Sequence, residues 1–166
     1  IALYNALVKL KVMVDNAWAD IDVQLKRRYD LIPNLVETVK GYASHEKGTF
    51  EAVVAARSKA MSAATPELRG EAEQGLTAAL GKLFALAEAY PQLRAAENFS
   101  QLQASLGSIE EAVQSARRYY NAVVRDFNTR IAQIPWNLVA GMLGYTAREF
   151  FQITDEAERA VPRVQF

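Results

Sequence analysis

The most constraining feature of the sequence is a stripe of apolar residues in the last third of the chain, spaced at alternating steps of three and four. An α-helix has about 3.6 residues per turn, so this spacing places the whole stripe on one face of a single helix. Ordering such a backbone costs about 1 to 2 kcal/mol per residue, and the helix therefore needs partners that bury its stripe. The stripe consists of Phe99, Leu102, Leu106, Ile109, Val113, Ala116, Tyr120, Val123 and Phe127.

Similar stripes occur earlier in the chain, and four amphipathic helices joined by short links bury their stripes together when they pack lengthwise. The sequence therefore predicts the all-α class and, within it, an antiparallel up-and-down four-helix bundle with long helices. The bundle is expected over residues 1–135, followed by a short irregular or helical C-terminal tail over 136–166 that packs on the bundle end. The predicted helices span approximately 3–29, 31–63, 66–90 and 98–133.

Capping residues and prolines set these boundaries. Asp30 can cap a helix that carries Pro33 in its first turn, where the missing N–H costs little. The Thr65-Pro66 pair combines a capping hydroxyl with proline at the first helical position, which is a strong start signal. Pro91 ends that third helix, and after a polar loop Asn98 is expected to cap the fourth.

Two glycines interrupt the second predicted helix. Gly41 and Gly48 are seven residues apart and face nearly the same way on a helix. They mark either a close helix crossing or a break in the helix, and a crossing is the favoured interpretation because each glycine costs about 1 kcal/mol relative to alanine.

Charge and residue counts exclude several classes of function. The chain has 19 basic and 19 acidic side chains, so it offers no strongly basic face for nucleic acid. It has no cysteine, which excludes disulfides, thiolate metal sites and a cysteine nucleophile. His45 is the one histidine and is expected at the surface, since a single imidazole cannot assemble a zinc or di-iron centre. We therefore predict no enzymatic activity, no cofactor and no bound metal.

One long segment carries a family resemblance. The thirty residues AWADIDVQLKRRYDLIPNLVETVKGYASHE, from Ala17 to Glu46, resemble the signature of the LemA family. Thirty residues in register are far more specific than helical periodicity. Ala19 departs from the pattern, because the family often carries serine or threonine there. Further matches lie at Tyr90-Pro91, Asn98-Phe99, Leu102-Gln103, Arg117-Arg118-Tyr119-Tyr120-Asn121 and Phe127-Asn128, so the resemblance covers nearly the whole chain.

Membership implies a bacterial up-and-down four-helix bundle, tethered by one amino-terminal transmembrane helix and without an established enzymatic activity. The sequence opens at Ile1 on an apolar run with no polar leader, and we expect the anchor to have been removed before residue 1. Lys9 and Lys11 closely follow the expected span, and basic residues near a span tend to stay inside. The body is therefore expected to face the cytoplasm of a single-pass membrane protein.

A basic cluster at residues 26–28 is expected at the end of the bundle away from the anchor. Lys26 lies about 39 Å of helix from the expected anchor, too far to contact anionic lipid. The cluster either complements the dipole at the end of a helix or contributes to a polar and aromatic surface that binds a protein or peptide partner. The residues of this predicted distal tip are Arg27, Arg28, Asp30, Asn34, Tyr90, Pro91 and Asn98.

The tail is rich in aromatic side chains, with two arginines close by. Rings and cations of this kind can sit among lipid headgroups, which predicts a membrane-proximal segment. The alternative, favoured because the tail contains two glycines and little charge, is that it folds back and plugs the end of the bundle. The aromatic residues concerned are Trp136, Tyr145, Phe150 and Phe151.

Several polar residues lie at or beside the apolar stripes. Their expected role is structural, since polar groups in a helical seam fix the register of the helices at some cost in stability. These residues are Gln24, Gln103, Arg117, Asn121 and Asn128.

Taken together, these features predict a membrane-tethered adaptor that binds a protein or peptide partner at its distal tip or in a groove between helices. The alternative is a bundle that binds a small ligand or lipid through its apolar tail and interior. Nucleic acid is not an expected partner of either.

Overall fold

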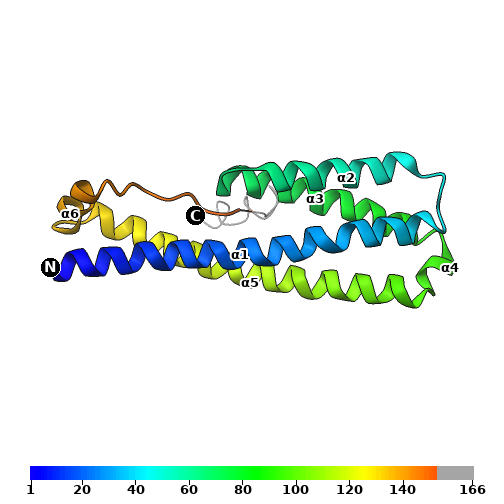
Figure 1. The fold of residues 1–166 in the computed structure, drawn as a ribbon, viewed down its shortest axis with the longest axis horizontal. Helices are drawn as coiled ribbons and strands as arrows, with labels where there is room; N and C mark the ends of the chain where they lie inside the picture. The colour runs from blue at the N-terminus through cyan, green and yellow to red at the C-terminus, as the bar shows by residue number, and fades with distance from the viewer. Residues whose placement is uncertain (153–166) are drawn as a thin grey trace, which may run out of the picture. The chain divides into compact units, whose positions relative to one another are not determined.

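The computed structural model describes residues 1–152, and within them the protein is all-α, with no strand (Figure 1). The predicted all-α class is thereby confirmed. The part of the predicted tail beyond residue 152 lies outside the described residues. The helices found are α1 (Ala2–Lys40), α2 (Lys47–Ser62), α3 (Pro66–Ala87), α4 (Pro91–Arg94), α5 (Glu97–Ala132) and α6 (Trp136–Leu143).

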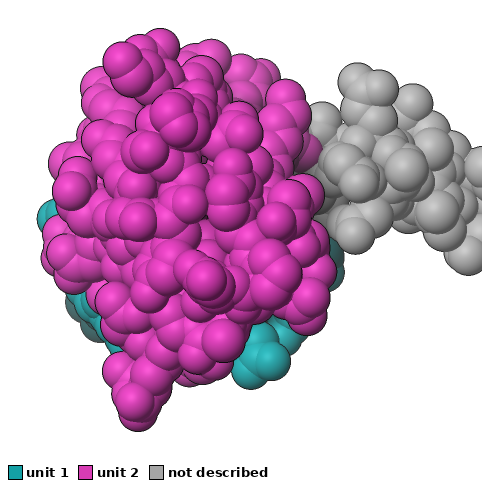
Figure 2. Space-filling view, turned by 90° about the vertical axis from the view of Figure 1, so that its right-hand side faces the viewer, with its two compact units in different colours: residues 1–27, 109–151 teal, residues 28–108, 152–166 magenta. Residues whose placement is uncertain are grey.

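The chain divides into two compact units (Figure 2). The first unit consists of Ile1–Arg27 and Ile109–Phe151. The second unit contains Arg28–Ser108 and takes up the chain again at Gln152. Both α1 and α5 contribute residues to each unit, because the boundaries between the units fall within these two helices.

The first helix is longer than the sequence suggested. α1 continues through Pro33 to Lys40, so the predicted break between residues 29 and 31 is wrong. Proline lacks the N–H that would bond the carbonyl four residues earlier, which here is the carbonyl of Tyr29. Nε of Arg57, from α2, donates to this carbonyl oxygen at 2.8 Å. The helix can continue because a side chain of another helix supplies the missing donor.

The break falls instead at residues 41–46, between α1 and α2. Gly41 lies in this link and Gly48 in the first turn of α2, so the two glycines mark a break and not the favoured helix crossing. The predicted single helix over 31–63 is therefore two pieces, the end of α1 and the whole of α2. His45 is exposed in the link between them.

The third helix begins as predicted. α3 starts at Pro66, and Oγ1 of Thr65 caps it by accepting from the N–H of Leu68 at 3.2 Å. It ends at Ala87, three residues before the predicted end, and the short helix α4 occupies part of the expected loop. α5 begins at Glu97, so Asn98 lies inside its first turn and is not the residue that precedes the helix.

In the first unit, α1 and α5 bury their stripes against each other. The rings of Trp18 and Tyr120, one from each helix, lie 5.4 Å apart between centroids. The buried side chains of α1, among them Val14, Ala17, Ile21 and Leu25, recur at steps of three and four, and the tail adds one more aromatic ring to the same core. Residues of this core include Leu7, Val14, Ile21, Leu25, Val113, Tyr120, Val124, Phe127 and Phe151.

In the second unit, α2 and α3 pack against each other and are joined by the link 63–65 (Figure 1). The ring of Phe84, in α3, lies 6.2 Å from that of Phe99, in α5. The Lys40 ammonium lies 5.8 Å from the ring centre of Phe50, which ties the end of α1 to α2. The core of this unit includes Ile32, Leu35, Val39, Val53, Leu76, Leu83 and Leu93.

Among residues 1–152, no helix combines the length and the apolar character that a crossing of the bilayer requires.

Candidate functional site

The described end of the tail lies in the first unit, where its last aromatic side chain enters the core. Phe151 has an exposed fraction of 0%. Its ring lies 5.4 Å from that of Trp18, edge to face, and Trp18 in turn packs against Tyr120. The tail therefore supplies a ring to a core that α1 and α5 leave incomplete.

Two asparagines of α5 hold the backbone of the tail. Nδ2 of Asn121 donates to the carbonyl of Phe151 at 3.0 Å, and its Oδ1 accepts from the N–H of the same residue at 2.9 Å. Asn128 makes the same reciprocal pair with Arg148, at 3.0 and 2.8 Å. Each side-chain amide thus bonds both backbone groups of one tail residue, as a neighbouring β-strand would.

The spacing of the two pairs fits the two kinds of chain. Asn121 and Asn128 are seven residues apart, which is two turns and about 10.5 Å of helix. Arg148 and Phe151 are three residues apart, which is about 9 to 10 Å of extended chain. The near equality of the two rises lets both amides bond the tail without distorting either element.

The side chain of Arg148 adds an ion pair to this arrangement. Its guanidinium lies 2.9 Å from Oδ1 of Asp15, in α1, and Lys11 lies 3.0 Å from the other oxygen of that carboxylate. Partial burial raises the pKa of Asp15, but the hydrogen bonds from Lys11 and Arg148 outweigh it and leave that pKa below its ordinary value of 3.8. Asp15 is therefore ionised at neutral pH.

Further contacts complete the site. The hydroxyl of Tyr120 donates to the carbonyl of Glu149 at 2.8 Å, and burial raises the pKa of that hydroxyl. The ring of Tyr145 lies 5.9 Å from that of Phe127. We call the residues of α1 and α5 that hold the backbone and side chains of residues 148–151 the tail seat: Asp15, Trp18, Tyr120, Asn121 and Asn128.

In the second unit, one glycine of α3 lies directly against the tail. A Cβ atom added at Gly70 would lie 2.2 Å from the carbonyl oxygen of Gln152, which is closer than any two such atoms can approach. At Gly75, in the same helix, an added Cβ meets nothing within 4 Å. Glycine at position 70 is therefore what allows the tail backbone to pass α3 at this point.

The second unit also buries a charged pair. The guanidinium of Arg28 lies 3.0 Å from the carboxylate of Glu73, with exposed fractions of 3% and 1% for the two residues. The same guanidinium donates to Oγ1 of Thr77 at 3.0 Å, and the hydroxyl of Tyr29 donates to Glu73. Burial, and then the Glu73 carboxylate, raise the pKa of the Tyr29 phenol well above its ordinary value of 10.0. This cluster ties α1 to α3.

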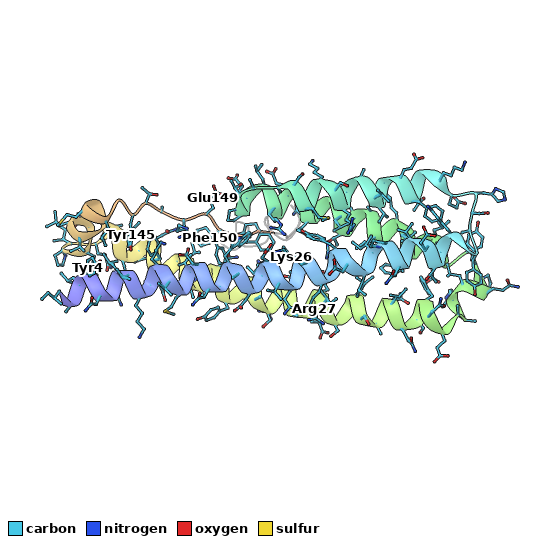
Figure 3. All side chains as sticks on the ribbon, viewed as in Figure 1. Tyr4, Lys26, Arg27, Tyr145, Glu149 and Phe150 are labelled. Atoms are coloured by element: carbon cyan, nitrogen blue, oxygen red, sulfur yellow. The ribbon has the colours of Figure 1, made fainter. Side chains whose placement is uncertain are left out.

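The predicted distal tip depended on a first helix that ends at residue 29, and α1 does not end there. Figure 3 labels Arg27 and Lys26 in the middle of α1, 13 and 14 residues before its end at Lys40. Arg27 donates to Gln24 at 2.7 Å, within its own helix. Arg28 is buried beside Thr77, which precedes the end of α3 by ten residues, or about 15 Å.

The remaining tip residues lie on two segments of the second unit. Asp30 and Asn34 are exposed within α1, ten and six residues before its end. Tyr90, Pro91 and Asn98 lie around α4, between α3 and α5. The sequence placed the end of the first helix at residue 29, whereas α1 ends at Lys40, so the basic cluster lies within this helix and not at its end.

A pocket does lie at the true end of α1. It has a volume of about 460 Å³ and is lined by residues of the α1–α2 link and of the two helix ends beside it. None of the predicted tip residues is among those lining it. They are Lys40, Ser44, Lys47, Phe50 and Glu51.

The tail aromatics fall into different environments. Phe151 is buried, whereas Phe150 is 37% exposed. Trp136 begins α6 and lies under the guanidinium of Arg130, 4.8 Å from the ring centre. Gly144, with φ of 71°, adopts the left-handed conformation that ends α6 and releases the chain into residues 145–151. The described tail thus folds back along α5, and does not merely cap an end.

The polar residues predicted as structural also separate. Gln103 is exposed, and Arg117 bonds Gln114 within α5 at 2.9 Å. Asn121 and Asn128 differ from these because they bond the tail and not another helix. Their seven-residue spacing is visible in the sequence, but nothing in the sequence indicates which segment they hold.

Comparison with known proteins gives relatives in bacteria. Magnetosome protein MamQ 2 of Paramagnetospirillum magneticum is 26% identical over 175 aligned residues, which cover 90% of this chain and 64% of that protein. Magnetosome protein MamQ of Magnetospirillum gryphiswaldense is 26% identical over 174 residues, covering 89% and 64%. Protein LemA of Metamycoplasma hominis is 24% identical over 152 residues, covering 91% and 69%. The chain thus spans less than two thirds of the length of the two MamQ relatives.

The family comparison covers more of the chain than the signature segment. The model described as the LemA family matches residues 17–166, which include both asparagines of the tail seat and the segment they hold. The resemblance carried by residues 17–46 is thereby confirmed, and the chain belongs to the LemA family.

Proposed function

We propose that this protein is a non-enzymatic bacterial adaptor that holds an extended segment of a partner protein on the tail seat of its first unit. The observation that carries this proposal is the pair of reciprocal asparagine bonds to the backbone of Arg148 and Phe151. Backbone groups are the same in every residue except proline, so these bonds do not require the chain's own tail. Residues 145–151 occupy the seat when no partner is bound.

The proposed adaptor is tethered to a membrane by an amino-terminal helix, with its body on the cytoplasmic side and its long helices arranged as an antiparallel four-helix bundle. Lys9 and Lys11, near the start of α1, support this orientation. Family membership supports the bundle and the tether. In this proposal the partner site is the tail seat.

The test uses a labelled synthetic peptide with the sequence of residues 144–151 and an amidated end, which stops before the position of Gln152, and measures its binding to the full chain by fluorescence anisotropy. Gly70→Ala places a Cβ against the carbonyl of Gln152 and so pushes the resident tail away without altering a seat residue. Gly75→Ala, on the same helix but in open space, is the matched control. We expect the peptide to bind the Gly70→Ala chain at least about tenfold more tightly than the control.

We call each pair of hydrogen bonds between an asparagine side chain and the backbone of one tail residue a clamp. Adding Asn121→Ala to Gly70→Ala removes both hydrogen bonds of one clamp and should abolish the tighter peptide binding of the Gly70→Ala chain. Circular dichroism checks that each variant keeps its helices. A full chain carrying Phe151→Ala should also release the resident tail from the seat, because it removes the buried ring that packs against Trp18. Equal binding by the opened and control chains would contradict the proposal.

A second candidate function, contact with a lipid surface, is favoured by α6. Ile134, Leu138 and Met142 recur at steps of four and are 82%, 66% and 87% exposed. Between Asp126 and Glu149 the chain carries two arginines and no acidic residue, which suits an anionic surface. Flotation with vesicles containing anionic lipid tests this function, and the variant with Leu138→Ser and Met142→Ser should then fail to float.

A further inference from the structure

We propose that the tail seat selects its partner segment by a pattern of three side chains at steps of three: an aromatic residue, a basic residue and a second aromatic residue. This inference rests on the proposed function and names the chemistry of the partner. The chain's own Tyr145, Arg148 and Phe151 follow the pattern in the resident segment.

The step of three follows from which tail side chains the first unit contacts. Tyr145, Arg148 and Phe151 each meet a side chain of α1 or α5. The intervening residues 146, 147, 149 and 150 are exposed. An extended chain with about three residues per turn returns every third side chain to the same face, as in polyproline II. The intervening positions therefore exert little selection.

The direction of the segment is fixed by the two clamps. Asn128 bonds the earlier residue, Arg148, and Asn121 bonds the later one, Phe151. The segment consequently runs opposite to α5. A partner with the same residues in reverse order would place its basic and aromatic side chains at the wrong clamps.

The last position of the pattern is the most selective. Phe151 is 0% exposed and lies 5.4 Å from the ring of Trp18. Removing a buried aromatic side chain loses its apolar contacts and leaves a cavity between rigid rings. A small side chain here cannot fill the space between the helices.

The middle position is selected by charge. Asp15 is ionised and faces this position, and its carboxylate pairs with Arg148 at 2.9 Å. An acidic residue in the partner would meet this carboxylate as a like charge. The first position is less demanding, since Tyr145 is only half-buried against Phe127.

The peptide set that tests the pattern is built on residues 144–151 with an amidated end and is titrated into the full Gly70→Ala chain by fluorescence anisotropy. The matched pair is a peptide with Phe151→Ala and a peptide with Phe150→Ala, which lose the same ring from neighbouring positions of 0% and 37% exposure. We expect the first change to weaken binding at least about tenfold and the second to weaken it less than about threefold.

Charge reversal tests the middle position. A peptide with Arg148→Glu should bind at least about fivefold more weakly than the parent, and Asp15→Arg in the protein should restore its binding while weakening the parent peptide. This double exchange also separates recognition from a general loss of folding, because a misfolded Asp15→Arg chain would bind neither peptide.

The outcomes distinguish this inference from the proposed function on which it rests. If all peptides bind with one affinity, the seat holds extended chains without selecting them, and the pattern is overturned while the adaptor function stands. If no peptide binds the opened chain, both are overturned. If the opened chain forms dimers in sedimentation and peptide does not compete with them, the occupant is a second copy, and the pattern of a separate partner is overturned.

Discussion

The two units bury polar groups among helices in opposite ways. In the first unit, the neutral amides of Asn121 and Asn128 bond the backbone of an extended segment. In the second, the charges of Arg28 and Glu73 bond each other across α1 and α3, both almost fully buried.

The two arrangements differ in whether the bound group can be replaced by another. An amide that bonds backbone groups accepts any extended segment of suitable shape, because those groups are common to all residues. A buried charge accepts only its counter-charge, since either ion without its partner is strongly unfavourable in the interior. The first arrangement suits an occupant that comes and goes, and the second suits a permanent crosslink between helices.

The largest expected effect comes from breaking the permanent crosslink. Glu73→Ala leaves Arg28 buried without its counter-charge and should lower the free energy of unfolding by about 3 to 5 kcal/mol. Urea denaturation followed by circular dichroism measures the loss. The double variant Arg28→Met with Glu73→Met is the control and should recover most of the stability. A loss under about 1 kcal/mol for Glu73→Ala would show that the two units do not differ in this way.

Removing one clamp should lower the free energy of unfolding by less, and by an amount that depends on how deeply the clamped tail residue is buried. Asn121→Ala leaves the N–H and carbonyl of buried Phe151 without partners and should cost about 2 to 3 kcal/mol. Asn128→Ala acts at a half-buried site that water can reach, and should cost about 1 kcal/mol. The exposed Asn16→Ala serves as control. Equal losses of unfolding free energy for Asn121→Ala and Asn128→Ala would show that burial of the clamped residue does not set the cost.

The bond between Arg57 and the carbonyl of Tyr29 can be tested with a double-mutant cycle. Arg57→Met should cost about 1 kcal/mol because the carbonyl loses its donor. In a Pro33→Ala background the helix regains its own N–H for that carbonyl, so the same change should cost much less. Thermal unfolding of the four chains gives the coupling energy. Additive effects would mean that the Arg57 bond does not compensate for the proline.

The smallest effect concerns pH. The pKa of Asp15 is lowered in the folded chain, so its pair with Arg148 contributes stability above the ordinary pKa of 3.8 and loses it as the pH falls through the lower, folded value. The expected contribution is under about 1 kcal/mol, since both partners are partly exposed.

Tryptophan fluorescence measures this loss. The chain has 2 tryptophans, and Trp136→Phe leaves Trp18, which contacts Phe151, as the sole reporter. Its emission should change as the pH falls below about 4, and Asp15→Asn should remove that change. An unaltered acid transition in Asp15→Asn would exclude the pair as its cause.

The start of α3 and the apolar stripes were predictable from local sequence. Thr65 and Pro66 act within one helical turn, and the stripe of α1 needs only a period. The end of α1 was not predictable in this way. Pro33 would normally end a helix, and it fails to do so here because Arg57 lies 24 positions further along the chain and folds back to it.

The candidate site was likewise predictable in part from local sequence and in part only from the tertiary structure. The spacing of Asn121 and Asn128 on one helix face is written in the sequence, as are the aromatic residues of the tail. That these asparagines hold residues 148 and 151 was decided by packing, because a side-chain amide bonds whichever backbone the surrounding core brings within reach.

The sequence by itself therefore determined the all-α class, the stripes that form the core and membership of the LemA family, since each depends on residues close together in the chain. The tertiary structure decided where α1 ends, which charges are buried and what the asparagines bind. These features depend on donors and acceptors that meet only after distant segments pack. Once buried away from water, each polar group must find such a partner, because an unpaired one costs free energy.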